Sequence, residues 1–286
     1  YQFWYKNEIT PGIMRIRRLQ MLTYEPSYYS LLLTPIALYY YLKLFIQKLP
    51  NPWIITLLVS VPILLSLSFG IILGIPLTLL FTFLFGFRTL FPNKSLVLYI
   101  IIGGIVFLLL TVAFILLFPE NVFVIRLNNV FSGTDISFNG RTTDSFYLGW
   151  EIASQKNIYF GCGLGQVKEV GLKIFQTFYN NTIFTVNDIG IPNSLADTLA
   201  TFGMVGITLR LIAEVYLFFK TRVYSNYYRF ALFLFIFIYQ FTGSFLTNIA
   251  EYVIWIMAFY NGLFPEFNKE SIGNEFTINK GLTKKY

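Results

Sequence analysis

Long stretches without a charged residue alternate along the chain with short segments that carry the charges. The uncharged stretches cover Pro26–Leu42, Leu49–Phe87, Ser95–Pro119, Phe230–Ala250 and Tyr252–Pro265. About 20 apolar residues are enough for a helix to cross the hydrocarbon core of a bilayer. The pattern therefore predicts an all-α integral membrane protein.

Breaks in this pattern predict where each helix begins and ends. The segment Trp53–Phe87 is too long for one span at a rise of about 1.5 Å per residue, and Ser66–Gly70 interrupts it with small residues. It therefore predicts two short spans. With the others, about seven transmembrane helices are expected, the remaining ones at Tyr28–Ile46, Leu96–Phe118, Leu195–Phe219, Phe230–Thr247 and Ile249–Phe264.

The basic residues predict the orientation of these helices. If the loop 119–194 lies outside, the other loops that carry Lys and Arg between and after the spans lie inside, as short cytoplasmic loops usually do. Arg15, Arg17 and Arg18 then lie outside, where an anionic ligand would explain them. The expected parts are an outer loop 1–27, four helices in 28–118, the extracytoplasmic loop 119–194, three helices in 195–264 and a cytoplasmic tail 265–286.

Composition excludes several kinds of chemistry. The 286 residues are 56% hydrophobic and 12% charged, with a net charge of +7, no His and one Cys, Cys162. Zinc sites of Cys and His, Ser-His-Asp triads and Cys-His pairs are therefore excluded. The basic excess reports membrane topology, so no nucleic-acid partner is expected. Because the chain starts with Tyr1 and shows no signal-peptide core, we expect it to be the C-terminal part of a longer protein.

The centre of the long loop predicts an amphipathic helix. Thr142 or Thr143 can cap this helix, which extends to about Lys156. One face carries, at spacings of three and four residues, Phe146, Trp150 and Ala153. Arg141 would lie at the helix N-terminus, where backbone N–H groups also favour an anion. Its alternative role is a local ion pair with Asp144.

Three glycines follow at a spacing of two, at Gly161, Gly163 and Gly165. Glycine lets the backbone approach a ligand closely, and successive N–H groups can form a nest that binds an anion. The spacing does not match a dinucleotide fingerprint. The alternative is a plain flexible loop.

Charged residues within or beside the spans are candidates for function. Arg210 and Glu214 are four residues apart, so they can form a structural pair on one helix face. Asp197 and Glu251 fall near helix ends. Their two alternative roles are that of a proton acceptor and that of a solvated helix-end charge. Glu25, directly before a proline and a span, suits acid–base work beside a bound phosphate or an interfacial salt bridge.

Several of these motifs occur in an order that is similar to a known family. The order is Arg18 to Glu25-Pro26, Leu65-Ser-Leu-Ser68, Gly140-Arg141, Gly161-Cys-Gly-Leu-Gly165, Asn193 and Gly203-Met-Val-Gly206. It resembles the Wzy-type O-antigen and capsular polysaccharide polymerases, which form one superfamily with the O-antigen ligases. The resemblance covers nearly the whole chain and rests on short motifs.

The resemblance implies a multi-pass glycosyltransferase of the bacterial inner membrane with its active site on the extracytoplasmic side. Such an enzyme moves a glycan from undecaprenyl diphosphate onto another lipid-linked repeat unit, without a cofactor, metal or nucleotide sugar. Its implied partners are these lipid-linked glycans, the lipid bilayer and a chain-length regulator.

The resemblance also implies roles for individual residues. The diphosphate would be held by arginine, which matches phosphate bidentately and keeps its charge, at Arg15, Arg17, Arg18 and Arg141. Glu25 is the first candidate for the base that deprotonates the acceptor hydroxyl, followed by Asp144 and Glu151. The glycan or the loops would be positioned by Trp150, Gly161, Gly163, Gly165 and Asn193.

Two departures from the family pattern matter. The ligases commonly place a His in the long loop, and this chain contains none, which favours a polymerase. Relatives often have Arg after the Ser-Leu-Ser motif, where Phe69 stands here, so no phosphate contact is expected there. The alternatives are an O-antigen ligase, a lipid-linked glycan flippase, which should show inverted repeats and broken helices, and a non-catalytic component of polysaccharide export.

Overall fold

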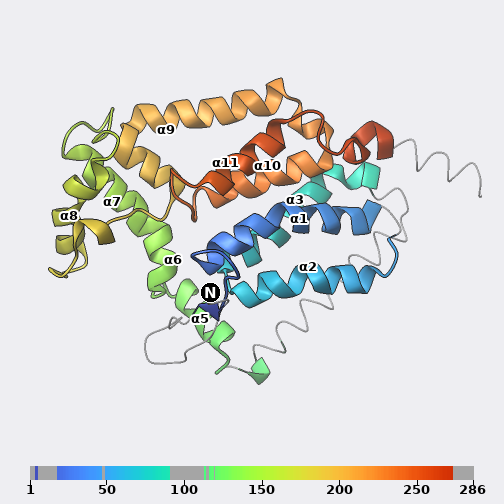
Figure 1. The fold of residues 1–286 in the computed structure, drawn as a ribbon, viewed down its shortest axis with the longest axis horizontal. Helices are drawn as coiled ribbons and strands as arrows, with labels where there is room; N and C mark the ends of the chain where they lie inside the picture. The colour runs from blue at the N-terminus through green and yellow to red at the C-terminus, as the bar shows by residue number, and fades with distance from the viewer. Residues whose placement is uncertain are drawn as a thin grey trace, which may run out of the picture. The chain divides into compact units, whose positions relative to one another are not determined.

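A computed structural model describes residues 4–5, 18–46, 49–90, 113, 116–118 and 120–272. These residues are mostly helical (71%) (Figure 1). The strands named in this part of the chain are β1 (Trp4–Tyr5) and β2 (Arg18–Leu19), which pair antiparallel. The helical class predicted from the sequence is confirmed for the described residues.

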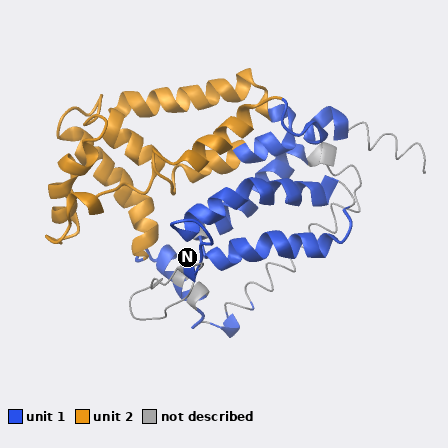
Figure 2. Ribbon diagram, viewed as in Figure 1, with its two compact units in different colours: residues 1–134, 224–232, 262–286 blue, residues 135–223, 233–261 orange. Residues whose placement is uncertain are grey.

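The chain divides into two compact units, coloured in Figure 2. Unit 1 contains residues 1–134, 224–232 and 262–286, and unit 2 contains residues 135–223 and 233–261. Helix α10 (Tyr227–Tyr239) begins in unit 1 and ends in unit 2.

Unit 1 is built on the N-terminal helices. Its elements are α1 (Pro26–Ile46), α2 (Pro52–Ser66), α3 (Phe69–Leu90), α5 (Val122–Phe131) and the short 3-10 helix η3 (Pro265–Phe267). Helix α1 packs against α2 and α3. The chain leaves α2 through Leu67, in the left-handed conformation (φ 48°), so the interruption lies within the small-residue segment that predicted it.

An aromatic cluster joins sequence-distant parts of unit 1. The ring of Tyr39 lies 4.7 Å from that of Phe264, and the ring of Tyr228 lies 5.6 Å from that of Phe267. The hydroxyl of Tyr39 donates to Glu266 Oε1 at 3.4 Å. The start of the predicted tail therefore packs into unit 1.

Unit 2 combines the long loop with the helices that follow it. Its elements are α6 (Ile136–Arg141), α7 (Thr143–Ser154), α8 (Val167–Phe178), the 3-10 helix η1 (Val186–Asp188), α9 (Ser194–Lys220), the end of α10 and α11 (Ile249–Phe259). A further 3-10 helix, η2 (Val223–Ser225), follows α9. The long loop predicted from the sequence is thus largely helical.

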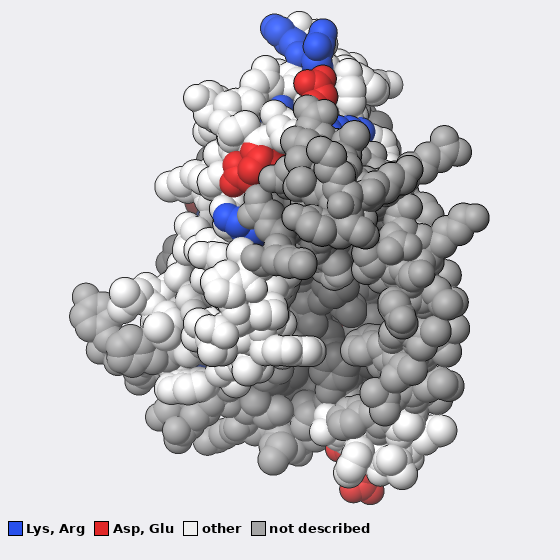
Figure 3. Space-filling view, turned by 90° about the vertical axis from the view of Figure 1, so that its right-hand side faces the viewer, with Lys and Arg blue, Asp and Glu red and all other residues white. Residues whose placement is uncertain are grey.

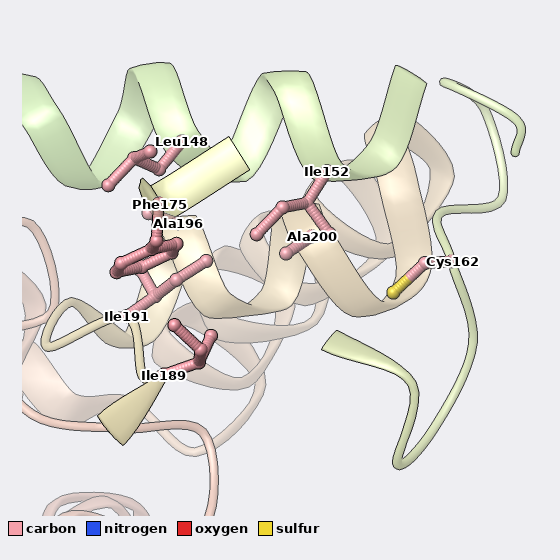
Figure 4. Close-up of a cluster of buried hydrophobic side chains, with 8 residues drawn as sticks. All are labelled: Leu148, Ile152, Cys162, Phe175, Ile189, Ile191, Ala196 and Ala200. Atoms are coloured by element: carbon pink, nitrogen blue, oxygen red, sulfur yellow. The ribbon is translucent and has the colours of Figure 1, made fainter. Parts of the chain in front are cut away.

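A hydrophobic core joins α7 to the first part of α9. It consists of buried side chains from α7, α8, α9 and the loops between them, at Leu148, Ile152, Cys162, Phe175, Ile189, Ile191, Ala196 and Ala200 (Figure 4). Burial of apolar side chains is the main favourable term in folding. This core therefore holds the long loop in a defined place within unit 2.

Two helices in the described part are long and apolar enough to cross a membrane, α1 and α9. The most apolar window of α9 is only 11% buried, whereas the core helix of a soluble protein would be mostly buried. Large apolar side chains face outward, including Leu209 (61% exposed) and Ile212 (59%). On the face drawn in Figure 3, the described surface is mostly uncharged. These features favour a membrane protein.

The last two apolar helices, α10 and α11, are shorter than the predicted spans. Helix α10 ends at Tyr239 and α11 at Phe259, where the sequence predicted spans to Thr247 and Phe264. At about 1.5 Å per residue they reach roughly 20 and 16 Å, less than the bilayer core of about 30 Å. Turns fill the segment between them. The predicted span Leu96–Phe118 lies almost entirely outside the described residues.

Candidate functional site

Helix α9 is broken at Gly203. This residue has φ 66° and ψ −162°, which lies outside the helical region. The ribbon of α9 changes direction along its length (Figure 1). A residue with a side chain would be strained in this conformation. The sequence predicted a continuous span at this place, and that prediction is wrong in detail.

A loop of unit 2 fills the break. In an unbroken helix the N–H of Met204 would donate to the carbonyl of Ala200. The N–H of Val205 would likewise donate to Thr201. Instead, these two N–H groups and two carbonyls all bond to the loop 158–163. The carbonyls of Ala200 and Thr201 accept from the N–H groups of Cys162 (2.9 Å) and Gly163 (3.0 Å). The N–H groups of Met204 and Val205 donate to the carbonyls of Ile158 (3.0 Å) and Tyr159 (3.0 Å). A break in an apolar helix is tolerated because its backbone groups find new partners.

The glycine motif makes this approach possible. A Cβ on Gly161 would lie 2.5 Å from the Thr201 carbonyl, and one on Gly203 would lie 2.4 Å from the Tyr159 carbonyl. Gly163 and Gly165 also have positive φ, at 96° and 75°. At Gly161 the backbone approaches α9, whereas the sequence suggested an approach to a ligand. A role of the glycines toward a ligand stays a prediction.

Cys162 lies in the same loop and is 3% exposed. Burial raises the pKa of its thiol. The thiolate is the nucleophilic form of cysteine, and a raised pKa disfavours it. Cys162 therefore serves as a packing element of the core in Figure 4.

The break brings together residues that a straight helix would keep apart. Arg210 Nη1 donates to the carbonyl of Ser194 at 3.3 Å and to Thr198 Oγ1 at 2.9 Å. Sixteen residues of straight helix would separate Arg210 from Ser194 by about 24 Å. The change of direction at Gly203 therefore places the guanidinium beside the first turns of α9.

Two carboxylates complete a buried charged cluster, defined here as Arg210, Glu214 and Glu251. Arg210 Nε lies 3.1 Å from Glu214 Oε1, and Arg210 Nη2 lies 2.5 Å from Glu251 Oε1. The Ser194 hydroxyl also donates to Glu251 Oε1 at 2.9 Å, and Gln240 Nε2 donates to Glu214 Oε2 at 2.8 Å. The predicted pair of Arg210 and Glu214 is present, but it belongs to a network that joins α9, α11 and Gln240, the residue after α10.

Glu251 differs from what the sequence suggested for a solvated helix end, because it is only 1% exposed. Asp197, the other carboxylate predicted near a helix end, accepts a bond from the Leu246 N–H at 3.1 Å. Both acids are therefore tied into the protein.

Asn193 connects the long loop to this region. It is fully buried, and its amide nitrogen donates to the carbonyls of Arg141 (2.8 Å) and Phe241 (2.6 Å). Its Oδ1 accepts from the N–H of Ala196 and so caps α9. The backbone of Arg141 is thus fixed to the start of α9.

A groove runs between α7 and α8. It has a volume of about 580 Å³, and Glu151, Glu169 and Lys173 are among the polar residues that line it. The rings of Tyr147 and Phe178 lie 5.2 Å apart on its wall. Of the candidate bases Glu25, Asp144 and Glu151, the lining of this groove includes Glu151.

Other residues predicted in the long loop lie as follows. Thr142 occupies the N-cap position of α7, but its hydroxyl donates backward to the Phe138 carbonyl at 2.8 Å. Asp144 accepts from the Thr143 hydroxyl at 3.3 Å. Trp150 is 47% exposed, and its role in positioning a glycan stays a prediction. The buried face of α7 carries Ser145, Leu148, Gly149, Ile152 and Ala153.

The arginines predicted to hold a diphosphate belong to different units. Arg18, in unit 1, donates from Nε to the Ser66 carbonyl at 2.9 Å and from Nη2 to the Leu67 carbonyl at 3.4 Å. It therefore bonds to the C-terminus of α2. Arg141 is the last residue of α6 in unit 2. Arg15 and Arg17 lie outside the described residues.

Glu25 directly precedes α1, and its carbonyl accepts the N–H of Tyr29 at 3.1 Å. A carboxylate at this position is favourable because it faces the positive end of the helix dipole. The interfacial salt bridge and the role as a base both stay predictions.

Sequence reasoning missed the break at Gly203 and the burial of Glu251. A signal for the first was present, since Gly203 and Gly206 lie inside an apolar helix, where glycine is unfavourable. A single Glu in an apolar run was the signal for the second.

No protein-family model matches the chain, and a search of curated proteins finds no match. Among the described residues, no group of three or more Cys, Asp and Glu side chains is placed to hold a metal ion.

Proposed function

We propose that the protein is a membrane glycosyltransferase that polymerises lipid-diphosphate-linked oligosaccharides, as the order of its motifs suggests. The observation that carries the proposal is the groove between α7 and α8, where aromatic rings and carboxylates line a space of about 580 Å³. Aromatic faces stack on sugar rings, and carboxylates accept bonds from sugar hydroxyls. The proposal includes about seven transmembrane helices, with the groove on the extracytoplasmic side.

In this proposal the acceptor sugar lies in the groove and Glu151 removes the proton of the attacking hydroxyl. The hydroxyl oxygen forms a bond to the anomeric carbon as the bond from that carbon to the diphosphate breaks. The diphosphate leaves with the electron pair. Arg141, held by Asn193, stabilises the negative charge that develops on it.

The break in α9 bears on the flippase alternative. In transporters, the free backbone groups of broken helices bind the substrate. Here the loop 158–163 uses the four groups at the break, so they are engaged within the protein. This favours the enzyme.

The test is a polymerisation assay with the full-length protein and a lipid-linked repeat unit. Glu151→Gln should lower the rate about 100-fold, because a general base contributes roughly that factor. Arg141→Lys should retain part of the activity and Arg141→Ala very little, since lysine keeps the charge without the bidentate geometry. Glu120→Gln, an exposed position outside the groove, is the matched control.

The polysaccharide made by cells lacking the gene separates the alternatives. Single repeat units on the surface indicate a polymerase. Long polymer that is not attached to its final acceptor indicates a ligase. Unchanged polymer, together with full activity of Glu151→Gln and Arg141→Ala, would overturn the proposal.

A further inference from the structure

The loop 158–165, between α7 and α8, exposes three large apolar side chains. Tyr159, Phe160 and Leu164 are 64%, 67% and 73% exposed, and the loop sequence contains no charged residue. Cys162 points the other way, into the core (Figure 4). One side of the loop is thus packed within unit 2, and the other side forms an apolar tip, defined here as Tyr159, Phe160 and Leu164.

Hydrogen bonds hold the backbone under the apolar tip in place. Asn157 Oδ1 accepts from the N–H groups of Tyr159 (2.9 Å) and Phe160 (3.2 Å). The same loop makes the four backbone bonds to the break in α9. The exposure of the apolar tip therefore belongs to a defined turn with satisfied backbone groups. Exposed apolar side chains gathered in this way mark an interaction surface.

The neighbouring surface of α9 indicates what covers the apolar tip. The Val205 N–H donates to the Tyr159 carbonyl, so the loop lies directly beside the second segment of α9 (Figure 1). Val205 is exposed, and at spacings of three and four residues the same helix face continues through exposed Leu209, Ile212, Tyr216 and Phe219. This face is the apolar surface that favours a membrane position for α9. The apolar tip extends it past the break.

The length of the second segment places the break near the edge of the bilayer core. Residues 204–220 span roughly 25 Å at about 1.5 Å per residue, against a core of about 30 Å. Lys220 ends the helix, and a lysine at a helix end reaches the polar boundary of the membrane. The opposite boundary then falls near the break, at the level of the apolar tip.

We propose that the apolar tip inserts into the interfacial layer of the bilayer that contains α9, between the lipid headgroups and the first part of the acyl chains. Tyrosine is enriched at this level because its ring is apolar and its hydroxyl is polar. Lys156 and Lys168, exposed on either side of the loop in sequence, fit the lipid phosphates. The loop that fills the break would thus also set the depth of α9. This contact requires α9 to lie in a membrane, and it does not depend on glycosyl transfer.

Fluorescence quenching in lipid nanodiscs measures the depth of the apolar tip. A bimane probe is attached to the full-length protein at Phe160→Cys or Leu164→Cys, and wild type treated in parallel shows whether the buried Cys162 reacts. Nitroxide lipids labelled near the headgroup should quench both probes more than lipids labelled deep in the acyl chain, and more than iodide in the water. Asn157→Ala removes the bonds that hold the turn, so it should raise iodide quenching of the Phe160→Cys probe.

Two control positions fix the ends of the depth scale. Ile212→Cys, on the exposed face of α9, should be quenched most by the deep nitroxide. Asn187→Cys, exposed on η1, should be quenched by iodide alone.

Three results would overturn the proposal. The first is iodide quenching of both tip probes equal to that of Asn187→Cys, without quenching by either lipid. The second is protection of both probes from iodide and from lipid, which would indicate a protein partner such as a second copy of this chain. The third is absence of lipid quenching at Ile212→Cys, which would remove α9 from the membrane. The polymerisation assay tests glycosyl transfer separately, so the two proposals can fail independently.

Discussion

Two apolar helical segments of this protein are interrupted, and they are interrupted in different ways. In unit 1, the chain between α2 and α3 turns at Leu67, and the Arg18 side chain bonds to the carbonyls of Ser66 and Leu67. In unit 2, α9 breaks at Gly203, and the backbone of the loop 158–163 bonds to the freed groups. A single side chain serves the first interruption and a folded segment serves the second.

The difference shows how the two units depend on distant parts of the chain. Ser66 Oγ donates to the Ile63 carbonyl, and the Ser68 N–H donates to Ser66 Oγ, so the first interruption is partly satisfied by its own residues. Its distant partner is the one side chain of Arg18, whereas the second depends on the backbone of a whole loop, 158–163. The break in α9 should therefore be the more sensitive of the two to small changes in backbone packing.

Gly203→Ala should have the largest effect. The added Cβ would lie 2.4 Å from the Tyr159 carbonyl, and φ of 66° is unfavourable for alanine, so we expect a loss of at least about 3 kcal/mol. Thermal unfolding in detergent measures it. Gly165 also has a positive φ, but a Cβ there would meet open space. Gly165→Ala should therefore lower the free energy of unfolding by about 1 kcal/mol. Gly140→Ala, with neither constraint, should be neutral; equal effects for all three would contradict the close approach.

Asn193→Ala should come next. It leaves the carbonyls of Arg141 and Phe241 without their bond to the amide, and it removes the cap of α9, at a cost of roughly 2–4 kcal/mol. Unfolding temperature gives the total, and hydrogen exchange at the start of α7 reports whether Arg141 is released. Asn128→Ala, at an exposed position, is the control. Unchanged exchange would show that Asn193 does not hold this loop.

Arg18→Ala should destabilise the first interruption by about 1–2 kcal/mol, since two carbonyls of α2 lose a charged donor. Lysine at this position should recover part of the loss. Comparing the unfolding temperature with the polymerisation rate separates the two roles proposed for Arg18. A normal melting temperature with a lost rate would identify a ligand contact and not a helix-terminus contact.

Asp188 should show the smallest effect, confined to the surface turn at η1. Its carboxylate accepts bonds from the Thr185 hydroxyl (2.7 Å) and N–H (2.9 Å), and these lower the pKa of Asp188. The stabilisation is present above the unfolded pKa, near 4, and is lost as pH falls through the folded value. Hydrogen exchange at residues 185–188 should show it. Asp188→Asn should remove this pH dependence and leave the break in α9 unchanged.

Much of the secondary structure could be predicted because its signals are local. The small residues at Ser66–Gly70 predicted an interruption that the structure places at Leu67, and Thr142 marked the start of α7. Apolar spacing placed Phe146, Trp150 and Ala153 on one face of α7, but spacing alone does not say which side meets a neighbour. Gly149 faces the backbone of Ala196 in α9, and only the fold reveals that partner.

The apolar stretches of this sequence by themselves determined a helical protein with segments suited to a membrane, since hydrophobicity and helix length depend only on neighbouring residues. The sequence also provided the glycines at 161, 163, 165 and 203 without showing that two of them meet. Tertiary structure decided that Gly203 breaks α9, that the loop 158–163 fills the break and that Arg210 reaches Glu251. These contacts depend on backbone groups far apart in the chain, which have no pattern of their own in sequence.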